Sequence, residues 1–257
     1  AIDATTLSAI GGATTGVVTA TNAIAISGTA DEVTAAMVTA NTLVVATTAK
    51  VTISDDANVA IDATTLSAIG GATTGIVTAT NAIAISGTAD EITAALVATD
   101  TLVVAAIAKV TISDADGVDI DATTLSAIGG VTAGVVTVVN AVEISGSVSE
   151  IVAALVTDAT KVVLAGNANV TASDVDGASD LSGVDPLGTL TAQLANDVDI
   201  SGNINLANVE NISINNGASV RMTTAQHALI TSAAGNNTVT LSNAGTVSGN
   251  AAVEGYV

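Results

Sequence analysis

The sequence predicts a repeat solenoid, β-rich with short helices, whose strand–helix–strand coils of about 27–32 residues stack into parallel sheets. One observation behind this prediction is a five-residue motif, exemplified by 51–55, whose copies begin at positions 24, 51, 83, 110, 142, 170 and 198. A second is that residues 2–12 return unchanged at 61–71 and 120–130, a longer period of about 59 residues. Each of these longer repeats holds two copies of the motif, so we expect two coils per repeat.

The recurring motif has the alternation of a strand with one buried face. In Val51-Thr-Ile-Ser-Asp55 the first and third residues are apolar and β-branched, and the second is polar. The fourth residue is Ser in every copy, which predicts a hydroxyl ladder along the stacked coils. The fifth position alternates between Gly and Asp, as in Gly28, Asp55 and Gly87, which supports a two-coil repeat.

Short helices are predicted after the strands by two kinds of N-terminal signal. The first is a capping box, in which Ser or Thr precedes Glu by three positions: Thr29–Glu32, Thr88–Glu91 and Ser147–Glu150. The second is an Asp N-cap before a helix that ends near a Gly-Gly pair: Asp3, Asp62 and Asp121.

A second strand in each coil is predicted from Val-Val elements, at 17–20, 43–46, 76–79, 102–105, 135–138 and 161–164. We expect the two strand types to form two separate parallel sheets, with the helices closing the third side. The regular solenoid covers residues 1–173, with repeats at 2–60, 61–119 and 120–179. Residues 174–190, which contain the one proline, are predicted to form an irregular loop, and 191–257 a divergent continuation of the same solenoid.

Composition excludes several classes of function. The formal net charge of −20, from 24 acidic and 4 basic residues, argues against nucleic acids and anionic membranes as partners. The absence of cysteine excludes disulfides and thiolate metal sites. No run of eighteen apolar residues occurs, so no membrane span is predicted.

Clusters of Asp residues at two turns are candidate Ca²⁺ ligands, because Ca²⁺ prefers hard oxygen donors. The candidates are Asp114, Asp116 and Asp119 at the first turn, and Asp174, Asp176 and Asp180 at the second. Neither cluster completes an EF-hand loop, and acidic surface turns without metal are the alternative interpretation.

Catalysis is not expected. The one histidine, His227, lies in a predicted helix over 223–230, and no Gly-x-Ser-x-Gly motif or phosphate-binding loop occurs. Apart from Ca²⁺ we expect no cofactor. Two alternatives stay open: a binding module such as a phage tail fibre or carbohydrate-binding adhesin, and a polysaccharide-active β-helix enzyme that uses paired carboxylates.

The three long repeats, with their Val-Thr-Ile-Ser-Asp and Ile-Ser-Gly-Thr-Ala segments, resemble long repetitive cell-surface proteins of bacteria, cyanobacteria included, known as β-strand-repeat proteins. Residues 209–226 look like stretches of surface-layer proteins and giant adhesins. The resemblance implies an extracellular structural or adhesive protein, often one that binds Ca²⁺.

We therefore expect a structural protein of the cell surface or exterior, as a segment of a surface layer, a filament or a giant adhesin. Solenoid ends expose unpaired strand edges. For that reason we expect self-association or a longer parent chain, with a glycan or another cell-surface molecule as a candidate partner.

Overall fold

The structure is a computed structural model that describes the chain except for residues 42, 158–161, 234 and 244–257. Lys161 and the last part of the predicted C-terminal continuation therefore lie outside the described residues. The chain divides into two compact units. The ranges given for them include some residues that the structure does not describe. The first comprises Ala1–Asp114, Ala127–Val139 and Ala159–Val163, and the second comprises Ala115–Ser126, Asn140–Asp158 and Leu164–Val257.

Short parallel strands and helices alternate along the chain, which confirms the prediction of repeated strand–helix units in parallel sheets. The first sheet has the order β1 (Ile2–Asp3), β3 (Ala25–Gly28), β5 (Lys50–Ile53), β7 (Val77–Ala79) and β9 (Val103–Val104). The second has the order β6 (Ala60–Asp62), β8 (Ala84–Gly87), β10 (Lys109–Ile112), β12 (Val136–Val138) and β14 (Val162–Leu164). A small sheet pairs β2 (Val18–Thr19) with β4 (Val44–Val45).

Paired strands lie closer together in the sequence than we predicted. In the first sheet the partners follow one another at intervals of about 25 residues, within the range of solenoid repeats: Ile2, Ile26, Val51, Val77 and Val103. The predicted coil length is wrong because it aligned equal motifs, whereas the sheet pairs Ile26 with Val51. The longer period, from Ile2 to Ile61, is not a multiple of this interval, so β6, the second copy of β1, begins a new sheet.

Two further predictions fail for the same reason. Ser27 lies opposite Thr52 and not opposite Ser54, so the continuous serine ladder does not form. The Val-Val strands form a sheet of their own only where β2 pairs with β4. Elsewhere the two strand types share a sheet, because β7 pairs with β5 on one side and with β9 on the other. Both strand types supply alternating β-branched residues, which is all that a shared sheet requires.

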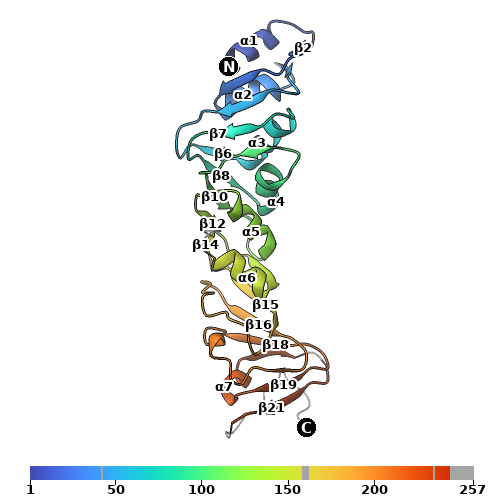
Figure 1. Cartoon of the computed structure of the whole chain (residues 1–257), viewed down its shortest axis with the longest axis vertical. Helices are drawn as coiled ribbons and strands as arrows, with labels where there is room; N and C mark the ends of the chain where they lie inside the picture. The colour runs from blue at the N-terminus through green and yellow to red at the C-terminus, as the bar shows by residue number, and fades with distance from the viewer. Residues whose placement is uncertain (42, 158–161, 234, 244–257) are drawn as a thin grey trace. The chain divides into compact units, whose positions relative to one another are not determined.

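The helices begin where their caps predict. They are α1 (Ala4–Gly12), α2 (Ala30–Met37), α3 (Ala63–Gly71), α4 (Ala89–Ile92), which continues as the π-helix η1 (Thr93–Val97), α5 (Ala122–Gly130), α6 (Val148–Leu155) and α7 (Thr224–His227). All three predicted capping boxes form, with both reciprocal hydrogen bonds. In the first unit α1 packs on α2, α2 on α3, and α3 on α4 and η1 (Figure 1).

The core of the first unit is built from residues that point inward from strands and helices. Ile26, Ile53 and Ile85 are fully buried on the strands, and Val33 and Ile92 are fully buried on the helices. None of these side chains is aromatic, and a β-branched residue suits each buried strand position.

The second unit contains a six-stranded sheet and a three-stranded sheet. The larger has the order β11 (Asp119–Asp121), β13 (Glu143–Ser147), β15 (Asn169–Val175), β16 (Leu190–Leu194), β18 (Asn211–Ile214) and β20 (Ile230–Ala233). The smaller has the order β17 (Val198–Asp199), β19 (Ser219–Met222) and β21 (Thr238–Leu241). Residues 176–189, between β15 and β16, form turns without a helix or strand, whereas the predicted loop over 174–190 also included the end of β15 and the start of β16.

The C-terminal strands continue the larger sheet at shorter intervals. The interval falls to about 20 residues, the lower end of the range for solenoid repeats: Val170 pairs with Leu190, Ala192 with Ile212, and Ile212 with Ile230. The described helical elements in these connections are short, the 3-10 helix η2 (Ile204–Leu206) and α7. Shorter helices therefore explain the shorter interval.

Candidate functional site

The carboxylates predicted to bind Ca²⁺ mostly bind the protein's own backbone. In the first unit Asp114 is buried, and its Oδ2 accepts a hydrogen bond of 2.7 Å from the Ala89 amide. In the second unit Asp116 Oδ1 accepts one of 2.9 Å from the Ala141 amide. Asp119 opens β11, where it is exposed and lies opposite Glu143.

The second predicted cluster forms turns within the second unit. Asp176 Oδ1 accepts from the Ala178 amide at 3.0 Å and from the Ser179 hydroxyl at 2.8 Å. Asp180 Oδ1 accepts from the Ser182 amide at 3.0 Å and from its hydroxyl at 2.6 Å. Asp174 lies at a shift of register in β15, with φ of 58°, and its side chain is exposed.

These contacts lower the pKa of two turn carboxylates. The Ser179 hydroxyl is the main cause of the lowered pKa of Asp176, and the Ser182 hydroxyl is the main cause for Asp180. Within the described residues no group of three or more His, Cys, Asp or Glu side chains is arranged to hold a metal ion. Ca²⁺ binding at these positions stays a prediction, and the contacts favour a structural role.

Asp55 and Asp114 explain the alternation of Gly and Asp that the sequence shows. Asp55 Oδ2 accepts a hydrogen bond of 2.7 Å from the amide of Ala30, the first residue of α2. Gly28 is needed for a steric reason, because a Cβ at this position would lie 2.8 Å from Ala4 Cβ and 2.9 Å from Glu32 Oε2. The alternation therefore reflects a helix cap and a close contact.

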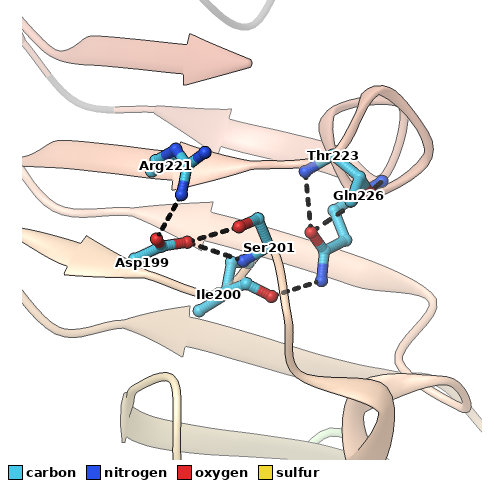
Figure 2. Close-up of polar contacts among 6 residues, drawn as sticks. All are labelled: Asp199, Ile200, Ser201, Arg221, Thr223 and Gln226. Carbon is cyan, nitrogen blue, oxygen red and sulfur yellow. Dashed lines mark hydrogen bonds and ion pairs between the residues drawn. The ribbon is translucent and has the colours of Figure 1, made fainter. Parts of the chain in front are cut away.

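An ion pair between β17 and β19 was missed by the sequence analysis. Asp199 and Arg221 are direct partners in the parallel ladder, and Arg221 Nη1 donates to Asp199 Oδ2 at 2.8 Å. The Ser201 amide and hydroxyl donate to Asp199 Oδ1 at 2.9 and 2.6 Å (Figure 2). The Ser201 hydroxyl, then its amide and Arg221, lower the pKa of Asp199 to about 2. Both side chains of the pair are about half exposed, and salt screens such pairs.

Gln226 links α7 to the loop after β17, as Figure 2 shows. Its Oε1 accepts from the Thr223 amide at 2.8 Å, as the last residue of a capping box does. Its Nε2 donates to the Ile200 carbonyl at 2.8 Å, which a glutamate could not do. Beside this region lies an open depression of about 280 Å³, lined by residues that include Asp197, Asp199 and Arg221.

His227, at the end of α7, is buried, and burial lowers the pKa of its imidazole. Burial therefore disfavours the charged form of the ring.

Comparisons of the chain with protein-family models, with curated proteins and with solved structures found no match. None of the helices in the described residues has the length and apolar run that a membrane crossing requires. The contacts of the polar residues above join neighbouring strands and helices, and they stabilise the fold.

Proposed function

We propose that the chain is a structural solenoid of the cell exterior, a segment of a surface layer, a filament or a giant adhesin. The observation that carries this proposal is that polar residues repeated along the chain form hydrogen bonds within the protein itself. Asp55 caps the helix that begins at Ala30, and Asp114 makes the same 2.7 Å bond to Ala89 in the next repeat. Equivalent hydrogen bonds in successive repeats are suited to a protein in which every repeat carries the same mechanical load.

The strand interval supports stacking of the repeats into coils. Strand partners follow each other at about 25 residues across the first sheet, and all pairings in it are parallel. Such a regular interval is typical of a solenoid, in which each coil contacts only its neighbours. The excess of acidic residues, 24 against 4 basic ones, would keep an array of many repeats dispersed by charge repulsion.

The two alternative functions have less support. A carbohydrate-binding tip or a polysaccharide-active enzyme usually needs aromatic side chains against the sugar rings, and the chain has no Phe or Trp. The depression beside Asp199 and Arg221 has two carboxylates in its lining, but Asp199 is held by Arg221, and Asp197 Oδ1 accepts a hydrogen bond of 3.1 Å from the Ser219 amide. We therefore retain the structural role.

A repeat-number series tests the proposal. One, two or three further copies of residues 61–119 are inserted after Asp119, which preserves the order of the repeats. With about 25 residues between paired strands, each copy adds about 2.4 coils, and at about 4.8 Å per coil the particle should lengthen by about 11 Å. Small-angle X-ray scattering measures the maximum dimension. Linear growth is the expected result, and growth that levels off as in a compact globule would reject the proposal.

A further inference from the structure

The first repeat exposes apolar side chains more than the second repeat exposes their copies. Ile10 is 48% exposed, whereas Ile69, at the same position of the next repeat, is fully buried. Val17 is 76% exposed and its counterpart Ile76 is 49% exposed. Residues 10–17 thus form a surface, here called the open face, whose copy in the second repeat is buried at Ile69 and less exposed at Ile76.

Neighbouring segments bind the second and third copies of this face at their threonines. Thr73 Oγ1 donates to the Ala49 carbonyl at 2.7 Å, and the Thr74 amide donates to the Thr47 carbonyl at 2.8 Å. In the third copy Thr132 Oγ1 donates to the Ala108 carbonyl at 2.6 Å. The covering segments are 46–53 and 105–112, which share the sequence Ala-x-x-Ala-Lys-Val-Thr-Ile.

The first copy has the same donors without that segment. Thr14 and Thr15, the counterparts of Thr73 and Thr74, are exposed. In the described residues β2 pairs with β4 alone, whereas its counterpart β7 pairs with β5 as well as with β9. The open face therefore ends in an unpaired strand edge, which is a template for a further strand.

In the second and third copies of the open face, a glycine packs against a backbone carbonyl of the covering segment. A Cβ at Gly75 would lie 2.0 Å from the Ala49 carbonyl oxygen, and one at Gly134 would lie 2.0 Å from that of Ala108. At Gly16 the nearest atom to such a Cβ is Thr14 Oγ1, at 3.5 Å. An open depression of about 470 Å³ lies here, lined by residues that include Gly11, Thr14, Gly16 and Val17.

We propose that the open face is a docking site for an Ala-x-x-Ala-Lys-Val-Thr-Ile segment supplied by a further repeat of this kind. A second folded copy of the chain cannot supply it, because both of its segments already cover Thr73 and Thr132. The carbonyl of the fourth residue accepts from Thr14 Oγ1, and the strand that follows pairs with β2. The inference rests on the proposed stacking of repeats and identifies the groups that join them.

The test adds one copy of residues 1–59 in front of Ala1, which places the copied Ala49 at the same sequence distance from Thr14 as Ala49 has from Thr73. Amide hydrogen exchange is followed by NMR at Thr15 and Thr21, the counterparts of Thr74 and Thr80, whose amides bind Thr47 and Ile53. We expect exchange at both amides to slow at least about tenfold, as amides in closed hydrogen bonds do. The Gly16→Ala variant should lose this protection in the extended chain and leave the melting temperature of the original chain unchanged.

Unchanged exchange at Thr15 and Thr21 in the extended chain would overturn the inference. If the particle still lengthens with repeat number, the proposed function survives that result, so the two failures are distinguishable. Protection that persists in the Gly16→Ala variant would also overturn it. Sedimentation of the original chain should show a monomer, and a dimer with a protected Thr15 would assign the face to a second copy instead.

Discussion

The Asp55 carboxylate accepts a hydrogen bond from the amide of Ala30, which opens helix α2 in the preceding part of the chain. The first amides of a helix have no intrahelical acceptor, and the capping box of Thr29 and Glu32 satisfies only some of them. Asp55 provides a further acceptor from the next strand connection. Asn243 does the same for Thr224 of α7 at 2.9 Å, so this contact persists in the divergent part.

Replacing Asp55 by alanine should destabilise the protein by about 1–2 kcal/mol, the usual cost of a lost cap and an unpaired buried amide. Asp114→Ala should cost a similar amount, and the double variant the sum, because the two sites lie in separate repeats. Urea unfolding measures these differences. The matched control is Asp56→Ala, whose exposed side chain adjoins Asp55 in the sequence; equal losses in Asp55→Ala and the control would exclude the capping role.

Gly75→Ala should destabilise the fold by about 1–3 kcal/mol, as overpacking does, because the new methyl group meets the Ala49 carbonyl. Gly71→Ala is the control, since its methyl group meets no atom within 4 Å. Thermal unfolding of both variants checks the prediction. If the Gly75→Ala variant were as stable as the control, the close contact between Gly75 and the Ala49 carbonyl would be wrong.

Stability should fall in acid as Asp199 takes up a proton. Its pKa in the folded protein, about 2, is below the ordinary value of 3.8, so its contribution is complete above about pH 4 and is lost between about pH 4 and 2. Ser201→Ala removes the main cause of the lowered pKa. NMR titration of the Asp199 carboxyl carbon should give a midpoint near 2 in the original chain and a higher one in this variant. Identical midpoints would refute the assignment.

Calcium should leave the melting temperature unchanged, because the Asp114, Asp116, Asp176 and Asp180 carboxylates already accept hydrogen bonds from the protein. Circular dichroism with excess Ca²⁺, with excess Mg²⁺ and with chelator checks this. A rise with Ca²⁺ alone would indicate a site that binds the folded state, and would support the calcium interpretation of the sequence.

The helices were predictable because their signals are local. Thr29 and Glu32 lie three positions apart, and that spacing alone defines a capping box. The pairing of strands was not predictable from motif matching, because Ser27 opposes Thr52 and both are hydroxyl residues that a sheet accepts equally. Asp199 and Arg221 become neighbours only through that pairing. No strand was predicted at Arg221, and the apolar residues on either side of it, Val220 and Met222, were the strand signal that could have found the pair.

The most direct test of the account is the pairing of Ser27, since the strand interval on which the stacking depends follows from it. The chain has no cysteine, so any disulfide that forms in a double-cysteine variant joins the two engineered residues or two copies of the chain. Parallel partners lie within the Cα separation that a disulfide needs. The pair Ser27→Cys and Thr52→Cys should oxidise to a disulfide, and Ser86→Cys with Thr111→Cys should do the same. Ser27→Cys with Ser54→Cys should remain reduced, and a disulfide in that pair alone would contradict the account.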